Sequence, residues 1–245
     1  MSLGELLTWL SQPLSGTSTH VVAPGVSWHG RLMVLAWGVA VPAAALLARF
    51  WKVTPRQRWP QELDNRFWWH GHRGLNTLAV VLSVAATALV IGPATSTATA
   101  RSLHAILGWF VLSLAAVQVV TALLRGSKGG PTAPSLRGDH YDMTARRVAF
   151  ERVHKTAGWL ATAAAIGALA SGLWAADALR WMALGLALLW AGFIGLFFAW
   201  QRQERCLDTY QAIWGPGPEH PGHARPATGW GVLRVRQGQG LPWQR

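Results

Sequence analysis

The sequence has almost no cysteine: Cys206 is the only one among 245 residues. A single thiol excludes an intramolecular disulfide framework, an iron–sulfur cluster held by thiolates, and covalent cofactor attachment through a Cys-x-x-Cys-His motif. Any metal or cofactor must therefore be held by other side chains. Nine histidines are available for that role.

Charged residues are also scarce, at 13% of the chain, whereas hydrophobic residues make up 51%. Soluble domains of this size are typically about 25% charged. The apolar residues form runs of about 20, the length that a helix needs to cross a bilayer. Many of the 16 tryptophans lie near the ends of these runs, where indole rings favour the headgroup region. We therefore expect an all-α integral membrane protein.

Acidic residues are few, at 10 against 22 lysines and arginines, so the formal net charge is +12. The basic residues lie in the connectors between the apolar runs and form no stripe on a soluble domain. They therefore indicate membrane orientation and contact with anionic lipid, and no nucleic-acid partner is expected.

The apolar runs predict five membrane-spanning helices, at about residues 28–50, 67–91, 102–124, 150–174 and 179–200. The first and third connectors are rich in arginine and lysine, whereas the second has only Arg101. The positive-inside rule then places these two connectors and the C-terminus in the cytoplasm and the N-terminus outside. We expect a multi-pass protein of the cell's inner (plasma) membrane.

Two segments lie outside the membrane domain of residues 28–200. Residues 1–27 carry leucines at helical spacing, without the basic start and cleavage site of a signal peptide, and predict an interfacial segment. Residues 201–245 are rich in Gly, Pro and Arg and predict a cytoplasmic, partly ordered tail. Residues 231–236 of this tail have the pattern of one short strand.

Four of the predicted spans begin with a histidine: His29, His72 (or His70), His104 and His154. An imidazole in hydrocarbon is costly unless it is ligated or paired. Because adjacent spans are antiparallel, His29 and His104 lie near the outer face, and the other two lie near the inner face. Each pair can supply both axial ligands of a b-type haem. Four helices would then form a dihaem bundle with irons roughly 20 Å apart, suited to transmembrane electron transfer.

Small and basic residues accompany these histidines. Gly108 and Gly158 each follow a candidate ligand by four residues, which leaves room for a flat macrocycle or serves helix packing. Arg31, Arg73 and Lys155 lie within two residues of candidate ligands. Either they pair with haem propionates, or they extend to the membrane interface.

His70 and His72 compete for the role of second-span ligand. They lie about 200° apart around a helix, so both cannot face one haem. His70 has the His-x-x-x-Gly spacing of the third and fourth spans, whereas His72 lies deeper in the second span. We predict that His72 is the ligand and that Asn76 hydrogen-bonds a buried polar edge on the same helix face.

Zinc and hydrolase chemistry fit the histidines less well. Two histidines at each face, without a carboxylate or cysteine, do not make a zinc site. The spans contain no set of nucleophile, base and acid. The remaining histidines lie in polar segments outside the spans and are interpreted as ordinary interfacial residues: His20, His140, His220 and His223.

The histidine segments resemble the cytochrome b561 superfamily, in particular the core attached to DOMON domains in eukaryotes and its bacterial relatives. The first span has the motif His29-Gly-Arg-Leu-Met33, followed by Pro42 and Arg49. The second reads Trp68-Trp69-x-x-His72-x-x-x-Asn76. The later spans contribute His104, Gly108 and Gln118, and then His154, Gly158 and Gly172. The resemblance covers residues 28–200.

This resemblance implies two haem b groups, ligated by His29 with His104 and by His72 with His154, and transmembrane electron transfer. Ascorbate-using members carry lysines shortly before the second-span ligand, whereas this chain has Arg66 there. The donor and acceptor therefore stay open among quinol, a cytoplasmic reductase and a periplasmic redox protein.

Two alternatives remain. The chain can be the cytochrome b membrane anchor of a multisubunit dehydrogenase, with its basic loops or tail docking another subunit. It can also be a cofactor-free scaffold or transporter, although little beyond Gln118 and glycines is polar at mid-membrane depth. A homo-oligomer is compatible with each of these functions.

Overall fold

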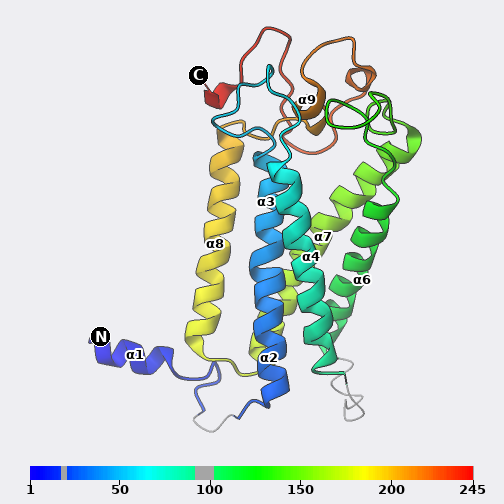
Figure 1. Ribbon diagram of the computed structural model, residues 1–245. Helices are drawn as coiled ribbons and strands as arrows, with labels where there is room; N and C mark the ends of the chain where they lie inside the picture. The colour runs from blue at the N-terminus through cyan, green and yellow to red at the C-terminus, as the bar shows by residue number, and fades with distance from the viewer. Residues whose placement is uncertain (18–20, 92–101, 245) are drawn as a thin grey trace. The chain divides into compact units, whose positions relative to one another are not determined.

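The computed structural model describes residues 1–17, 21–91 and 102–244. Within these ranges the chain is all-helical, and its β pairing is limited to isolated bridges (Figure 1). One bridge, Leu207 with Leu233, is all that forms where a short strand was predicted at 231–236. That prediction is wrong because no neighbouring strand is present to extend the ladder.

The first long helix runs continuously over Pro24–Phe50 as α2 (Pro24–Met33), a π-helical stretch (Val34–Ala40) and α3 (Val41–Phe50). Proline suits the first helical position because its missing N–H is unpaired there in any case. Pro42 cannot donate to the carbonyl four residues earlier, and the π-helical stretch ends two residues before it.

The other long helices are α4 (Phe67–Ala88), α6 (Leu103–Leu123), α7 (Ala145–Ala175) and α8 (Arg180–Arg202). Together with Pro24–Phe50, the last three give four helices long and apolar enough to cross a membrane. Only 6% of the most apolar window of α6 or of α8 is buried, which suits contact with lipid. These helices support a multi-pass membrane protein.

The second predicted span, α4, is helical but is not among the four apolar candidates. Its first turns carry His70, His72, Arg73 and Asn76, and these side chains lower its mean hydropathy. The five-span prediction is therefore supported for four helices, and a membrane-spanning role for α4 stays a prediction.

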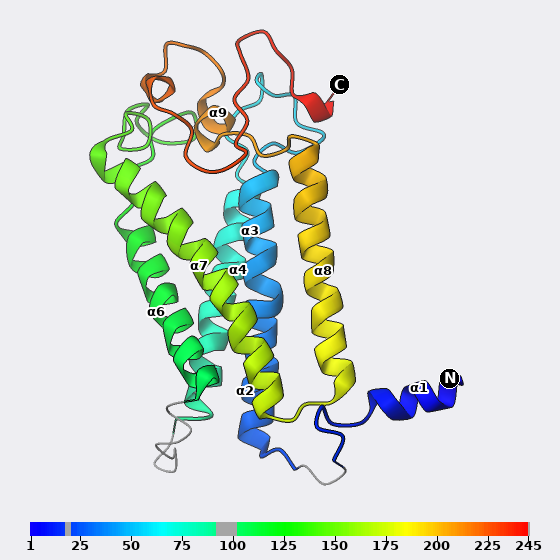
Figure 2. The same cartoon turned by 180° about the vertical axis from the view of Figure 1, so that it is seen from behind.

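The described chain divides into two compact units. Unit 1 comprises Met1–Pro42, Leu75–Ala115 and Leu160–Ile194. Its core is built largely from small residues that allow helices to approach closely, including Ala36, Ala79 and Ala165. Trp37 anchors this core by donating from Nε1 to the Ser83 hydroxyl at 3.0 Å. At the edge of unit 1, α1 (Leu3–Leu10) lies near the start of α8 (Figure 2).

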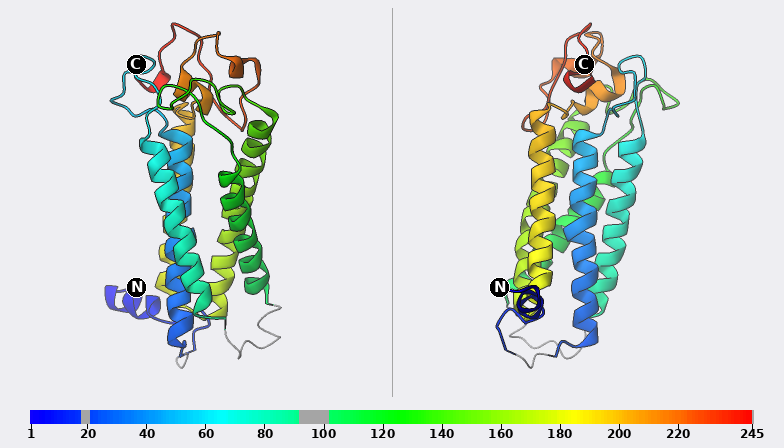
Figure 3. Two further views of the ribbon diagram at one scale, coloured as in Figure 1. Left: turned by 45° about the vertical axis from the view of Figure 1, so that its right-hand side comes forward. Right: turned by 90° about the vertical axis from the view of Figure 1, so that its left-hand side faces the viewer.

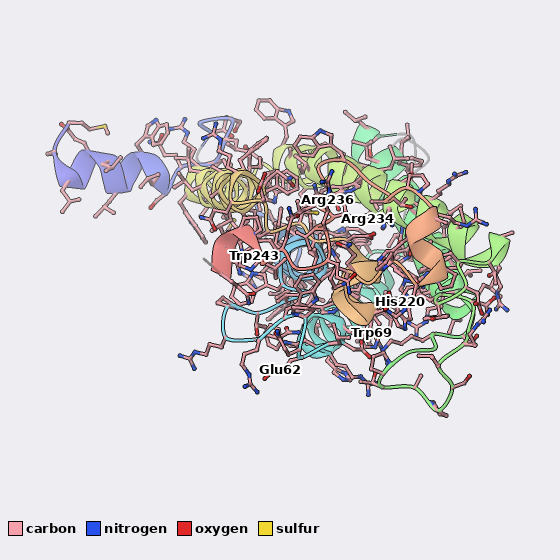
Figure 4. The ribbon with its side chains drawn as sticks, turned by 90° about the horizontal axis from the view of Figure 1, so that it is seen from above. Glu62, Trp69, His220, Arg234, Arg236 and Trp243 are labelled. Carbon is pink, nitrogen blue, oxygen red and sulfur yellow. The ribbon has the colours of Figure 1, made fainter. Side chains whose placement is uncertain are left out.

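Unit 2 comprises Ala43–Gly74, Ala116–Trp159 and Gly195–Arg245. Figure 3 shows the first turns of α4 running alongside α3 in this unit. The connectors 51–66 and 124–144 lie with the C-terminal segment and its helix α9 (Thr209–Trp214) (Figure 1). Figure 4 looks down on this end, where Glu62, His220, Arg234 and Trp243 are spread across it.

The C-terminal segment is more ordered than its Gly- and Pro-rich composition predicts. Tyr210 is 2% exposed, and its hydroxyl donates to the Tyr141 carbonyl at 2.7 Å and accepts from the Gly222 N–H at 3.0 Å. The amide of Gln211 pairs with both backbone groups of Val235, at 2.9 Å each. Tyr210 therefore holds this segment to the connector that contains Tyr141, and Gln211 holds two parts of the segment together.

Candidate functional site: two histidine pairs

Each unit brings together one of the predicted histidine pairs. In unit 1, the rings of His29 on α2 and His104 on α6 have centroids 6.0 Å apart and an interplanar angle of 88°. In unit 2, His72 on α4 and His154 on α7 have centroids 6.2 Å apart and an angle of 71°. All four rings are half-buried.

Three of these rings are oriented by backbone carbonyls. His29 Nδ1 donates to the Ala86 carbonyl at 2.9 Å, and His104 Nδ1 donates to the Ala168 carbonyl at 2.9 Å. His72 Nδ1 donates to the Ala44 carbonyl at 3.1 Å. A carbonyl can only accept, so the proton resides on Nδ1, and in the neutral ring Nε2 keeps its lone pair for a metal.

His154 is held differently. Its Nδ1 is buried without a hydrogen-bond partner among the described residues. Its ring lies 5.0 Å from that of Phe150 at an interplanar angle of 30°. Its backbone carbonyl accepts from Gln118 Nε2 on α6 at 2.8 Å. Packing against Phe150 therefore takes the place of the carbonyl that orients each of the other rings, while the Gln118 amide ties the α7 backbone to α6.

The ring separations are compatible with a metal shared within each pair. A metal–imidazole bond of about 2.0 Å allows the centroids of two coordinating rings to lie up to roughly 6.3 Å apart. The observed 6.0 and 6.2 Å are close to this value. Among the described residues, no three His, Cys, Asp or Glu side chains gather into a metal site. A metal at either pair would therefore need further ligands from a macrocycle, and the residues present fit a haem.

The glycines near the histidines serve different purposes. A Cβ added to Gly108, one turn after His104, would meet nothing within 4 Å, so space is open there. A Cβ on Gly158 would instead lie 3.5 Å from the amide nitrogen of Gln118. A Cβ on Gly172 would lie 2.8 Å from Cε1 of His104, so this glycine lets the ring approach α7.

The remaining predicted site residues lie near the pairs without a common arrangement. Arg31 is exposed, with Cζ 5.0 Å from the Trp28 ring. Arg73 is also exposed, with Cζ 5.7 Å from the ring of Trp69. Asn76 is half-buried on α4.

His70 and Lys155 differ from the ligand pairs in their surroundings. His70 is exposed, unlike the half-buried His72. Lys155 is already engaged, because its Nζ donates to Glu151 at 3.1 Å and to the Thr228 carbonyl at 2.9 Å.

A buried charge network beside His154 was not anticipated from the sequence. Arg147 donates from Nη2 to Glu151 Oε1 at 2.9 Å and to Nε2 of His140 at 3.1 Å. The i,i+4 spacing of Arg147, Glu151 and Lys155 is a signal that identifies the ion pairs. Burial, together with the nearby Arg147 and Lys155 charges, holds the pKa of His140 well below 6.5.

Space is open beside Gly108, and Gly172 lets the His104 ring approach α7. Three of the four rings donate to a backbone carbonyl, that of Ala44, Ala86 or Ala168. The arrangement brings one pair of imidazole side chains together in each unit. The function must be inferred from these residues and their geometry, since the chain matches no protein-family model, no curated protein and no solved structure.

Proposed function

We propose that this chain is a dihaem membrane cytochrome of the b561 type, which transfers electrons across the membrane. His29 with His104 would ligate one haem b, and His72 with His154 would ligate the other. The observation that carries the proposal is the matched separation of the two pairs, 6.0 and 6.2 Å between ring centroids.

The chain's own residues would supply ligation, orientation and space. The carbonyls of Ala44, Ala86 and Ala168 fix three ring orientations and leave Nε2 as the donor atom. The open space beside Gly108 suits a macrocycle edge. Haem, when bound, supplies one-electron chemistry, and the protein tunes it through the axial ligands and their hydrogen bonds.

Exposed cations near the pairs suit the acidic side chains of haem. Arg31 and Arg73 are each exposed on the helix that carries a ligand, two residues after His29 and one residue after His72. Neither makes an ion pair among the described residues. They would pair with propionates at the polar edges of the two sites.

Transfer across a membrane requires the two sites to lie near opposite faces. The connector charges would place the His72 and His154 site on the cytoplasmic side and the His29 and His104 site on the outer side. Electrons would pass between a cytoplasmic-side or quinol donor and an outer-face acceptor. Membrane lipid and a redox protein are the expected partners, and α4 would complete the set of five spans.

A pyridine haemochrome assay of the purified protein tests the proposal. We expect two b haems per chain, and a loss of one haem from each of His104→Ala and His154→Ala, with different spectral components removed. Each site would lose one of its two protein ligands in these variants. Gln203→Ala at an exposed position serves as the control and should keep both haems. One haem or none in the unmodified protein would contradict the proposal, as would loss of the same component in both variants.

A further inference from the structure

The N-terminal helix α1 is an amphipathic helix whose leucines are only partly covered by protein among the described residues, because Leu6 and Leu10 are half-buried and Leu3 and Leu7 are exposed. Leu3, Leu6, Leu7 and Leu10 follow the i, i+3, i+4, i+7 spacing of one apolar stripe. Leu3 is 73% exposed and Leu7 is 56% exposed. No residue of α1 is buried.

A helix of this kind is not stable in water by itself. It has only eight residues, and isolated helices shorter than about 12 residues are marginal even with alanine-rich sequences. A capping box supports its start: the Ser2 hydroxyl accepts from the Glu5 N–H at 3.3 Å, and the Ser2 N–H donates to the Glu5 carboxylate at 2.7 Å. A cap contributes about 1 kcal/mol, so the helix needs a surface that buries its leucines.

The segment after α1 is attached to the turn between α7 and α8. Pro13 and Leu179 form an antiparallel bridge. The Leu14 N–H donates to the Ala178 carbonyl at 3.0 Å, and the Arg180 N–H donates to the Gln12 carbonyl at 3.0 Å.

Side chains strengthen this attachment, which we call the α1 latch and define as residues 9–15 against 177–180. The Ser15 hydroxyl donates to the Asp177 carboxylate at 2.7 Å. The Arg180 guanidinium lies 4.8 Å from the Trp9 ring and donates to the Gln12 side chain at 2.8 Å. The latch therefore holds α1 to the turn instead of leaving it as a free tail.

The latch fixes the position of α1 beside the α7–α8 turn in unit 1. Both α7 and α8 are apolar enough to cross a membrane, so the turn that joins them marks a bilayer boundary. Exposed tryptophans adjoin this turn on both helices: Trp174 is 72% exposed and Trp181 is 51% exposed.

We infer that α1 lies in the headgroup region of the bilayer and inserts its leucine stripe among the lipid chains, so that the latch ties the α7–α8 turn to the membrane surface. A second protein copy is a poorer occupant. A helix of eight residues is only about 12 Å long. The surface area that it can bury is therefore far smaller than the roughly 800 Å² that each partner buries in a standard protein–protein interface. This inference is independent of the haem proposal.

Depth-resolved fluorescence quenching tests the inference. In a Cys206→Ala background, a single environment-sensitive nitrobenzoxadiazole label is attached at Leu3→Cys or at Thr8→Cys. These two positions point about 140° apart around the helix. The protein is reconstituted in nanodiscs of phosphatidylcholine and phosphatidylglycerol, with or without a nitroxide on carbon 5 of the acyl chain.

We expect the nitroxide lipid to quench the Leu3 label at least about three-fold more than the Thr8 label, and aqueous iodide to quench in the opposite order. Replacing both Leu6 and Leu7 by serine should remove this difference while the protein stays monodisperse. Equal lipid quenching at the two labelled positions would overturn the inference. Disulfide-linked dimers formed through an unlabelled Leu3→Cys would instead identify a second copy as the occupant.

Discussion

At the scale of single residues, two neighbouring histidines have different surroundings. His70 is exposed, whereas His72 is half-buried, donates to the Ala44 carbonyl, and lies 6.2 Å from the His154 ring. The two side chains point about 200° apart, so one helix cannot offer both to one metal. This geometry supports His72 as the ligand, which remains a prediction.

The haem content of two single variants, His72→Ala and His70→Ala, distinguishes the two candidate ligands. We expect His72→Ala to lose the haem shared with His154, because half of the ligand pair is removed, and His70→Ala to keep it. The visible spectrum and haem-to-protein ratio measure this. The reverse pattern would transfer the ligand assignment to His70.

His140 predicts a pH dependence of stability. Its Nε2 accepts from Arg147, and protonation would remove this acceptor in a buried site where desolvation and the nearby arginine and lysine charges outweigh the Glu151 carboxylate at 3.5 Å. Because the folded-state pKa lies well below 6.5, the unfolded chain binds more protons as the pH falls below 6.5. Stability from this residue is therefore complete above pH 6.5 and is lost progressively at lower pH.

The measurement is the thermal unfolding midpoint in mild detergent between pH 7.5 and pH 5. The unmodified protein should lose stability over this range, and His140→Gln should show a smaller decrease. His220, which is half-buried in the same unit, provides His220→Gln as a comparison that retains the decrease. Identical slopes for the unmodified protein and the His140 variant would contradict the prediction.

At the scale of elements, one glycine on α6 and one on α8 can show whether the open space beside α6 holds a cofactor. A Cβ on either Gly108 of α6 or Gly192 of α8 would meet nothing within 4 Å. Of these two glycines, Gly108 alone follows a candidate ligand, His104, by one helical turn. The protein alone therefore tolerates a larger side chain at both positions, whereas a haem beside α6 would not.

Matched substitutions test this difference. Gly108→Val should lower the content of the haem shared by His29 and His104 by at least about half, because the branched side chain occupies the open space. Gly192→Val should leave haem content unchanged. Both variants should retain helical circular dichroism. Full haem content in Gly108→Val would show that the space has another use.

At the scale of the whole molecule, the asymmetry of the connector charges predicts an orientation. The cationic connectors 51–66 and 124–144 and the C-terminal segment all belong to unit 2, whereas the N-terminal helix belongs to unit 1. The positive-inside rule therefore predicts that these connectors and the C-terminal segment lie in the cytoplasm.

Reporter fusions at the C-terminus measure the orientation. A fluorescent reporter that folds only in the cytoplasm should be active there, and a phosphatase reporter that needs the outer compartment should be inactive. A phosphatase fusion after Ile91 should show the opposite behaviour, because the second connector is expected outside. An active phosphatase at the C-terminus would invert the assignment of the two haem sites.

Much of this organisation could be predicted from the sequence because it depends on local composition. An apolar run of about 20 residues specifies a membrane helix wherever its neighbours lie. The helices at 24–50, 103–123, 145–175 and 180–202 therefore lie close to their predicted positions. A histidine near the start of an apolar run is likewise visible without any tertiary information.

Other features were decided only by the tertiary structure, because they depend on contacts between distant residues. The acceptors for His29, His72 and His104 are backbone carbonyls, which every residue carries, so no sequence pattern marks Ala86, Ala44 and Ala168. Gly158 faces an amide from another helix, whereas Gly108 faces open space, although both follow a histidine by four residues. The C-terminal segment is ordered by Tyr210 and Gln211, whose partners lie 12 to 69 residues away along the chain. Composition does not reveal such partners. A Gly- and Pro-rich composition predicts a poorly ordered segment, but burial of a few large side chains offsets the conformational entropy that is lost when the segment becomes ordered.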